Sequence, residues 1–392
     1  MRRVLLVLLA VLLAGAPASA AGRPEVKAQA ETPGLFDDEE GGNADADDPA
    51  IWVNDREPGR SIVVATAKEG GLYSYRLDGT QIKHVPAPAR PGPEHAPGRF
   101  NNVDIVGDIA IVSDRGRDQI RFYQVNGLVD VTAPDVPFVF NTTQSEVDEQ
   151  QTAYGLTAWY DKRDRATYVL VSRRSTTRVA LLRVEPRGAK FSYKVVRTLD
   201  LPAEFTLPNG VKWQPCDEPG QQPQVEGMVV DYRTGTLYAG QEDVGIWRMS
   251  ARLDDKPVLI DKVREFGIPG TYDPSTEECT PGKDPGFGGK HVSADVEGLT
   301  IHYGRNLLLA SSQGDNSFAA YDLPGRYRTS FQVKYKDDLV QESDGAAVIG
   351  TGLGHRFPNG LLVVQDGDNT GEPRDSTNFK FVGWDDVAHA IR

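Results

Sequence analysis

A sixfold repeat of short apolar segments constrains the fold of this 392-residue chain more than any other feature. Counted at its second residue, the opening segment of each unit recurs at positions 49, 103, 155, 227, 298 and 345. A second apolar segment follows in every unit and ends in small and polar residues, as in IVVATAKE at 62–69 and TLYAGQED at 236–243. A third, amphipathic segment such as GLYSYRL or GIWRMS completes the unit.

This repeat predicts an all-β fold. The segments are short, rich in β-branched and aromatic residues, and separated by Gly, Pro, Asp and Asn. Successive units start 54, 52, 72, 71 and 47 residues apart. Blades of β-propellers are four-stranded sheets with repeats of roughly 40 to 50 residues. We therefore expect a six-bladed β-propeller over residues 37–392; a pair of β-sandwiches would explain the strands but not their recurrence.

The first 36 residues stand outside the repeat. Arg2 and Arg3 precede an apolar run that ends at Leu13, and small residues follow at 18–20. This pattern is typical of a secretory signal peptide over residues 1–20 and predicts a secreted, extracellular protein. The run is too short for a membrane anchor, which needs roughly 20 apolar residues. Residues 21–36 are expected to form a leader or linker, part of which could supply a strand that closes the ring.

The chain is acidic, with a formal net charge of −13 that becomes −15 once the two leader arginines are removed. Affinity for nucleic acids comes mainly from clustered Lys and Arg, so such a protein is a poor nucleic-acid binder. We expect a monomer without a membrane or nucleic-acid partner after signal cleavage, acting on a small molecule.

Two cysteines, Cys216 and Cys279, lie in Pro- and Gly-rich insertions at 202–224 and 268–290. In an exported protein they are expected to form a disulfide, which would tie two adjacent blade loops together. Two reactive thiols are the alternative.

Charged residues at the repeated positions are sorted by sign. Equivalent positions of successive blades lie around one ring, so the polar tips of the second segments should converge. Blades one to three contribute cations there, including Lys68, Arg115 and Arg174, whereas blades four to six contribute acids and amides, including Glu242 and Gln313. The opening segments add further oxygen donors: Asp47, Asp48, Tyr154, Glu226, Asp295, Glu297 and Asp344.

This sorting indicates a metal site beside a phosphate site. Crowded carboxylates are stable chiefly when they coordinate a hard cation, and the absence of a His or Cys cluster favours calcium over zinc. Lys and Arg suit a phosphorylated or carboxylated ligand. Cations beside a bound metal suit phosphate-ester hydrolysis, in which the metal polarises the phosphoryl group and activates a water. A solvated charged turn is the alternative for Asp47 and Asp48, and simple core packing is the alternative for Tyr154.

Several motifs in sequence order resemble the β-propeller phytases over roughly residues 40–386. They are DADDPAIW, GRFNNVDI, VEGMVVD, GTLYAGQEDVGIWRM, DVEGLTIHYG, LLLASSQGDNSFAAYD and LLVVQDGDN. The resemblance implies a six-bladed propeller that binds several calcium ions. It also implies a secreted, 3-phytase-like phosphoric monoester hydrolase that acts on calcium-bound inositol phosphates by direct attack of a calcium-bound water.

Site residues follow from the same resemblance. The catalytic residues that it implies are Lys68, Arg115, Tyr154, Arg174, Glu226 and Glu242. The residues implied to bind substrate are Lys68, Arg115, Tyr154, Arg174 and Gln313. The implied calcium ligands are Asp47, Asp48, Glu226, Glu242, Asp295, Glu297, Gln313, Asp344 and Asn378. The chain departs from the family pattern at Glu69, where a second lysine is common, at Arg174, where lysine is usual, and at Gln241, which replaces a frequent acid.

Two other functions stay open on the sequence alone. The chain could be a non-catalytic secreted propeller that binds an anionic ligand or a protein partner, since fold does not imply function. It could also be a phosphatase for another phosphomonoester. The carboxylates favour catalysis, because a simple anion binder has little use for Glu226, Glu242 and Glu297 beside its cations.

Overall fold

Six β-sheets stand around a central axis in the computed structural model, which describes residues 22–36, 45–372 and 374–392. The predicted six-bladed β-propeller is confirmed. The predicted signal peptide at 1–20 lies outside the described residues. Among these residues, no helix is both long enough and apolar enough to cross a membrane.

The first three blades each contain four strands that pair antiparallel in chain order. Blade 1 contains β3 (Pro49–Trp52), β4 (Ile62–Thr66), β5 (Leu72–Tyr75) and β6 (Gln81–Val85). Blade 2 contains β7 (Phe100–Val106), β8 (Ile109–Asp114), β9 (Gln119–Gln124) and β10 (Val129–Asp130). Blade 3 contains β11 (Ala153–Asp161), β12 (Ala166–Arg173), β13 (Arg178–Arg187) and β14 (Lys190–Asp200).

The last three blades follow the same plan, with additions at their edges. Blade 4 contains β17 (Val225–Asp231), β18 (Thr236–Gln241), β19 (Gly245–Ser250) and β20 (Val258–Lys262). Blade 5 contains β23 (Val296–His302), β24 (Leu307–Ser312), β25 (Ser317–Asp322), β26 (Arg326–Tyr335), and the edge strands β1 (Glu25–Lys27) and β27 (Asp338–Leu339). Blade 6 contains β28 (Ala346–Ile349), β29 (Leu361–Asp366), β30 (Asn378–Gly383) and β2 (Ala30–Glu31).

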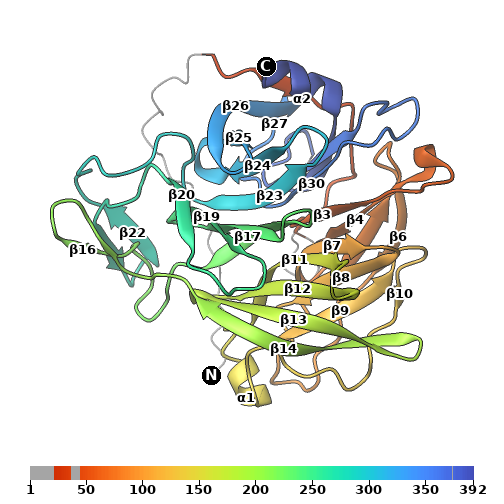
Figure 1. Cartoon of the computed structure of the whole chain (residues 1–392), viewed down its shortest axis with the longest axis horizontal. Helices are drawn as coiled ribbons and strands as arrows, with labels where there is room; N and C mark the ends of the chain where they lie inside the picture. Colours follow the sequence, from red (N-terminus) through yellow and green to blue (C-terminus); the bar gives the residue numbers. More distant parts are fainter. Residues whose placement is uncertain (1–21, 37–44, 373) are drawn as a thin grey trace.

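The ring closes because the inner strand of each blade contacts the inner strands of its neighbours, including β28 against β3. Inner strands such as β7, β11 and β17 lie near the middle of Figure 1, and outer strands such as β6, β10 and β14 lie toward its edge. The inner strands of all six blades line a central cavity of about 500 Å³. The sixfold repeat therefore brings equivalent residues of distant segments to one axis.

The segment at 22–36 takes part in the propeller. β2 pairs antiparallel with β30, with Ala30 opposite Phe381, and supplies the fourth strand of blade 6. β1 pairs in parallel with β26, with Val26 opposite Val333. The expected leader thus adds a strand that completes the ring, as the sequence left open. It ties the start of the described chain to its end.

The remaining elements lie in connections between strands, except the C-terminal helix, which follows the last strand. They are α1 (Gln144–Val147), α2 (Trp384–Ala390), the 3₁₀ turns η1 (Pro58–Arg60) and η2 (Gln313–Asp315), and two hairpins, β15 (Phe205–Thr206) with β16 (Lys212–Trp213) and β21 (Gly270–Asp273) with β22 (Glu278–Pro281). The two hairpins belong to the insertions that separate blade 4 from its neighbours.

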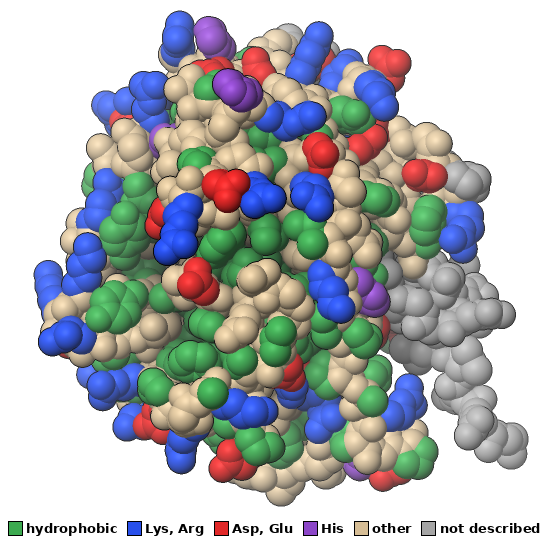
Figure 2. Space-filling view, turned by 90° about the vertical axis from the view of Figure 1, so that its right-hand side faces the viewer, with side chains coloured by type: hydrophobic (Ala, Val, Ile, Leu, Met, Phe, Trp, Pro, Cys, Tyr) green, Lys and Arg blue, Asp and Glu red, His purple; other side chains and the backbone are tan. Residues whose placement is uncertain are grey.

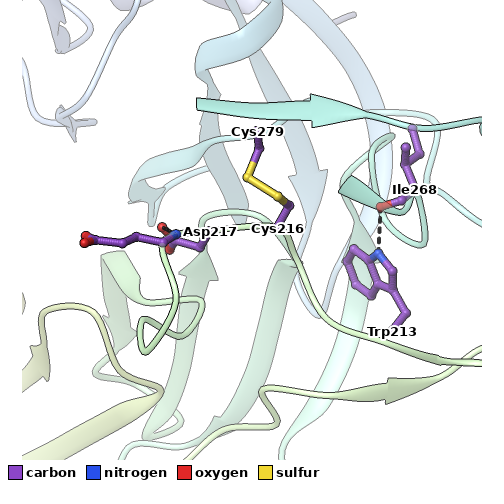
Figure 3. The surroundings of a disulfide bond; sticks show 6 residues. Trp213, Cys216, Asp217, Ile268 and Cys279 are labelled. Atoms are coloured by element: carbon purple, nitrogen blue, oxygen red, sulfur yellow. Dashed lines mark hydrogen bonds between the residues drawn. A yellow bond between two sulfur atoms is a disulfide. The ribbon is translucent and has the colours of Figure 1, made fainter. Parts of the chain in front are cut away.

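The predicted disulfide between Cys216 and Cys279 is confirmed, with the two Cα atoms 6.0 Å apart (Figure 3). The bond joins the insertions before and after blade 4, so it ties adjacent blade loops as expected. Nearby, the Trp213 indole N–H donates a hydrogen bond of 2.7 Å to the carbonyl of Ile268 (Figure 3). The Trp213 ring also packs on Phe266, with ring centroids 4.6 Å apart. The two insertions therefore form one cross-linked unit.

The second strand of each blade is almost entirely buried, because neighbouring blades cover both of its faces. All six residues of β24 and of β29 are buried, and so are all but the first residue of β18. Such strands read as continuous apolar runs that end in polar residues only where they leave the core. This explains why the polar tips of these strands gather at one end of the propeller.

Candidate active site at one end of the propeller

The predicted site residues come together because of the antiparallel pairing within blades. The start of each inner strand lies opposite the end of the second strand, as for Ala153 with Arg173, Val225 with Gln241, and Val296 with Ser312. Acids at the strand starts therefore meet acids, amides and cations at the strand ends. The predicted site residues lie at this end, and so does Asn378, which starts β30 opposite Asp366 at the end of β29.

Three glutamates form the centre of the site. One carboxylate oxygen from each of Glu226, Glu242 and Glu297 lies within 4.8 Å of the others, and all three side chains are buried. Burial raises the pKa of Glu242 well above its usual value, and the charges of Asp295 and Glu226 raise it further. Burial and the neighbouring Glu226 and Glu242 likewise raise the pKa of Glu297. Glu242 and Glu297 therefore need either protons or a bound cation.

Four aspartates surround this centre. Asp47, only 1 % exposed, and Asp295 both have a pKa raised by burial and then by a neighbouring acid, Glu226 for Asp47 and Asp243 for Asp295. Burial also raises the pKa of Asp344 to about 7, although Lys68 opposes the shift.

Asp48 differs from the other aspartates because part of its hydrogen-bonding capacity is used within the fold. Its Oδ2 accepts a 3.0 Å hydrogen bond from the Val103 amide, at the start of the neighbouring blade. Burial raises the pKa of Asp48, and the Val103 hydrogen bond opposes that shift. Asp48 thus connects the inner strands of blades 1 and 2.

The donor set fits a hard divalent cation. The three glutamates offer only carboxylate oxygens, and Asp47 Oδ1 and Glu297 Oε2 are buried without any hydrogen-bond partner in the described part of the chain. Buried oxygen atoms of this kind are rarely left unpaired. Hard cations such as calcium take six to eight oxygen ligands, whereas zinc prefers nitrogen and sulfur.

Glu226 joins the acidic and basic parts of the site. Its Oε1 accepts a 2.6 Å hydrogen bond from the Asn101 amide, and its Oε2 accepts a hydrogen bond from the Tyr154 hydroxyl. Burial, followed by the charges of Glu226 and Glu242, raises the pKa of Tyr154, so the phenol stays protonated and donates. Tyr154 therefore lies at the site itself, although it is also a buried residue.

Lys68 faces the aspartates. Its Nζ lies 2.6 Å from Asp45 Oδ2 and 3.8 Å from Asp344 Oδ2. Burial disfavours the charged form, but Asp344, Asp45 and Asp47 outweigh it and raise the pKa of Lys68. The amine therefore stays cationic, and Asp45 acts as an ion-pair partner in this structure.

Arg115 and Arg174 are the other two cations that the sequence predicts to bind phosphate. The Arg115 guanidinium lies over the Tyr154 ring, 5.5 Å from its centroid, and donates a 3.3 Å hydrogen bond to Asn101 Oδ1. Burial lowers the pKa of Arg115 to about 10, and the nearby Arg99 and Arg174 lower it in the same direction. Arg99 and Arg174 are thus near enough for their like charges to act on Arg115.

Gln224 is a site neighbour that the sequence reasoning missed. Its amide Nε2 lies 3.0 Å from both carboxylate oxygens of Glu242, and its Oε1 accepts a 2.7 Å hydrogen bond from the Ser175 amide, next to Arg174. The available signal was its place in the QVEG motif, two residues before Glu226. Gln313 was predicted, and its amide donates a 2.8 Å hydrogen bond to Asp344 Oδ1.

Asn378 contacts other residues than the three glutamates, and its role as a calcium ligand stays a prediction. Its amide donates a 2.9 Å hydrogen bond to Asn369 Oδ1, in a separate polar cluster around Lys380. The Lys380 amine is fully buried, at 2.7 Å from Glu31, 2.5 Å from Asp338 and 3.1 Å from Asp366. An ammonium group therefore supplies the positive charge among these acids.

The grouping of charge at the site differs from the outer surface. On the face in Figure 2, Lys and Arg side chains are interspersed with Asp and Glu side chains around hydrophobic ones. At the site, cations from blades 1 to 3 face carboxylates from blades 4 to 6 and blade 1. Such an arrangement can bind an oxyanion on one side while a metal is held on the other.

Comparison with known proteins agrees with this geometry. The model of the family described as Phytase matches residues 2–181 and 283–392. A 3-phytase from Bacillus subtilis (strain 168) is 31 % identical over 375 residues, which cover 89 % of this chain and 82 % of the relative.

Two solved structures are more distant. Regucalcin, a calcium-binding protein from Agrobacterium tumefaciens, is 12 % identical with a TM-score of 0.47, over 92 % of this chain and 97 % of the other. Virginiamycin B lyase from Staphylococcus aureus is 12 % identical with a TM-score of 0.44, over 87 % and 95 %. The family match covers well over half of the chain and the Bacillus relative most of it, so this protein belongs to the phytase family.

Proposed function

We propose that this protein is a secreted, calcium-dependent phytase that releases phosphate from inositol phosphates. Its family consists of phosphoric monoester hydrolases, which makes it an enzyme of that class. The observation that carries the finer proposal is the convergence of Glu226, Glu242 and Glu297 within 4.8 Å, beside the cations Lys68 and Arg115. An inositol phosphate offers the oxyanions that these cations suit and the ester bond that metal-assisted hydrolysis needs.

The residues that would hold calcium are the three glutamates together with Asp47 and Asp295. Bound calcium would neutralise the crowded carboxylates and supply Lewis acidity toward a phosphoryl oxygen and the attacking water. Asn101 and Tyr154 hold Glu226 in place through its two oxygens, so this carboxylate cannot rotate away from the centre. Asp344 and Gln313 are hydrogen-bonded to each other at the edge of the same group.

The cations would bind and orient the phosphate group. Lys68 is a compact charge, whereas Arg115 and Arg174 can each bind two phosphate oxygens at once. In the reaction, water attacks phosphorus, the bond between phosphorus and the ester oxygen breaks, and the released inositol hydroxyl takes up a proton. The positive charge on this side stabilises the negative charge that develops on the phosphoryl oxygens.

The test is phosphate release from inositol hexakisphosphate with calcium, after chelation, and after calcium is restored. We expect release with calcium, a fall to background on chelation, and recovery on restoration. Activity that survives chelation would contradict the metal requirement, and no release with calcium would contradict the phytase assignment. Assays on other phosphomonoesters address the alternative substrate class, and calcium-independent binding without turnover would favour the non-catalytic alternative.

We also propose that residues 1–20 are a signal peptide and that the exported protein is a monomer. The support is the run of apolar residues after Arg2 and Arg3 and the small residues at 18–20. The disulfide between Cys216 and Cys279 is compatible with an oxidising compartment. N-terminal sequencing of the exported protein should begin at residue 21, and light scattering should give the mass of one chain.

Replacement of Gln224 by methionine should lower phosphate release about tenfold to a hundredfold, because residues that orient metal ligands commonly contribute that much. The substitution keeps the side-chain length but removes the amide that holds both oxygens of Glu242. Excess calcium should recover part of the activity if the loss lies in metal affinity. Gln222→Met, two residues away on an exposed side chain, is the matched control and should change little. Equal effects of the two variants would contradict the positioning role.

A further inference from the structure

The insertion that leads into blade 4 contacts the turn after β12, where Arg174 lies. Ser175 follows Arg174 directly and has a φ of 56°, in the left-handed region that residues other than glycine rarely adopt. Its amide donates a 2.7 Å hydrogen bond to Gln224 Oε1, and its hydroxyl donates one of 2.9 Å to Gln221 Oε1. Its carbonyl accepts a 3.1 Å hydrogen bond from the Gln222 amide. Every polar group of Ser175 is thus bound by the last four residues of the insertion.

Arg174 is held on both sides of its backbone. Its own amide donates a 2.9 Å hydrogen bond to the carbonyl of Thr152, and the next residue, Ser175, is bound to the insertion. The insertion also brings a charge close to Arg174. Partial burial raises the pKa of Asp217, and the charge of Arg174 opposes that shift. The direction of the Arg174 side chain therefore depends on where the insertion lies.

Gln241 holds the two ends of the insertion together. Its side chain is fully buried at the end of β18, and its Nε2 donates hydrogen bonds of 3.2 Å to the carbonyl of Pro202 and 2.8 Å to that of Pro223. Its Oε1 accepts a 2.9 Å hydrogen bond from the Trp247 indole. A carboxylate has no proton to donate to these carbonyls, so the position requires an amide. The insertion is therefore a closed loop with a fixed base.

The disulfide fixes the middle of this loop. Residues 214–224 form neither strand nor helix, and Cys216 joins them to β22, where Cys279 lies opposite Tyr272 of β21 (Figure 3). Cys216 also packs tightly against β21, because a Cβ added at Gly270 would lie 2.4 Å from the Cys216 Cβ. The second hairpin is thus the support on which the irregular part of the loop rests.

Gln221 connects the cross-linked part of the loop to Ser175. Its Nε2 donates a 2.5 Å hydrogen bond to Glu218 Oε2, while its Oε1 accepts the hydrogen bond from the Ser175 hydroxyl. Glu218 lies two residues after Cys216, and its amide donates a 2.6 Å hydrogen bond to Asp217 Oδ1. A short series of contacts therefore runs from the disulfide to the residue beside Arg174.

We infer that the disulfide-linked insertion is a positioning element of the active site, in which Gln221 and Ser175 hold Arg174 ready to bind a phosphate group. The inference rests on the proposed function, in which Arg174 binds phosphate. It gives the disulfide a role in activity as well as in stability. Without it, residues 214–224 lose their support in the middle, and Arg174 must be ordered each time a ligand binds. That ordering costs binding free energy.

The experiment measures binding of myo-inositol hexakissulfate by calorimetry in the presence of calcium, together with phosphate release from inositol hexakisphosphate. We expect Gln221→Met to weaken binding and to raise KM about threefold to tenfold, the range that one lost hydrogen bond commonly gives, with kcat little changed. Cys216→Ser/Cys279→Ser should act in the same direction. The exchange variant Glu218→Gln/Gln221→Glu keeps the contact between the two side chains and an acceptor for Ser175, so it should bind like the wild type.

Arg174→Gln decides whether the effect passes through Arg174. In that background, Gln221→Met should cause no further loss of affinity for the hexakissulfate, because nothing remains for Gln221 to position. Gln222→Met is the matched control and should bind like the wild type, since its side chain is exposed and its contact with Ser175 uses the backbone amide. Calorimetry gives the answer even if the wild type releases no phosphate, so failure of the proposed function is distinguishable from failure of this inference.

Three results would overturn the inference. If Gln221→Met and the disulfide variant both bind the hexakissulfate as tightly as the wild type, the insertion only stabilises the fold. If Gln221→Met weakens binding equally with and without Arg174, its effect reaches the ligand by another route. If Arg174→Gln itself binds like the wild type, there is no contact for the insertion to position. Thermal unfolding identifies any variant that fails to fold, and Gln221→Met with its exchange variant then carries the test.

Discussion

Replacement of Glu226 by glutamine should lower phosphate release by a factor of about a thousand or more while the propeller stays folded. The substitution keeps the shape of the side chain but removes the charge at the centre of the group formed with Glu242 and Glu297. A metal ligand is lost, and the hydrogen bonds from Asn101 and Tyr154 lose their ionised acceptor. Loss of metal chemistry removes several kcal/mol of transition-state stabilisation, and each 1.36 kcal/mol is about tenfold in rate.

The same variant should be less active but, without calcium, more stable than the wild type. Without calcium, Glu226→Gln should unfold at a higher temperature than the wild type, because one of several mutually repelling buried charges is gone. With calcium, it should gain less stability than the wild type, since it binds the ion more weakly. Thermal unfolding with and without calcium measures both effects. Glu204→Gln, an exposed acid paired with Lys212, is the control and should change neither rate nor calcium response.

Near-normal turnover by Glu226→Gln would contradict the role proposed for this carboxylate. A calcium response equal to that of the wild type would contradict its role as a ligand, whatever happens to the rate. The two measurements therefore distinguish a residue that holds the metal from one that only supports Tyr154.

Replacement of Lys380 by methionine should destabilise the protein by about 3–5 kcal/mol, the usual cost of leaving a buried charge without its partner. The Lys380 amine is fully buried and contacts carboxylates of Glu31, Asp338 and Asp366, from three different parts of the chain. Without the ammonium, these acids would face one another uncompensated. Urea unfolding at neutral pH measures the loss, and Lys334→Met, which breaks only a 3.5 Å surface pair with Glu25, should cost less than about 1 kcal/mol.

The Lys380 effect should shrink as pH falls. The ammonium favours ionised partners, and it holds the pKa of Asp338 below its usual value despite burial. In Lys380→Met this support is lost, the pKa of the acids rises, and protonation removes the uncompensated charge. A destabilisation that stays constant between neutral and mildly acidic pH would show that packing, and not charge, explains the loss. The double variant Lys380→Met/Asp366→Asn should recover part of the stability.

Much of the fold was predictable from the sequence because the repeat shows which positions of successive units are equivalent. The spacing of the units gave six blades, and the position of each polar residue within a unit indicated that Glu226 and Glu297 share one ring. The disulfide was predictable because the two cysteines lie in the two long intervals. All of these inferences depend on order along the chain, which the sequence states directly.

Other features depended on how distant segments meet. Asn378 follows the register of blade 6. Its amide nevertheless donates hydrogen bonds to Glu31, from the first described segment, and to Asn369, so it belongs to the cluster around Lys380. Arg99 lies before its repeat unit and reaches the site only because Phe100 pairs with Lys68. Gln224 ends an insertion whose path no periodicity predicts.

The sequence by itself determined the architecture, the end of the propeller at which the predicted site residues gather, and the sorting of charge there, because strand period and blade order fix where a side chain points. Only the tertiary structure decided which charges pair. Lys68 with Asp45, Arg99 with Glu69 and Lys380 with Asp338 are contacts between segments whose approach depends on loops and on closure of the ring. Coulomb energies and desolvation change steeply over a few ångströms, so the partners of each buried charge follow from the packed chain.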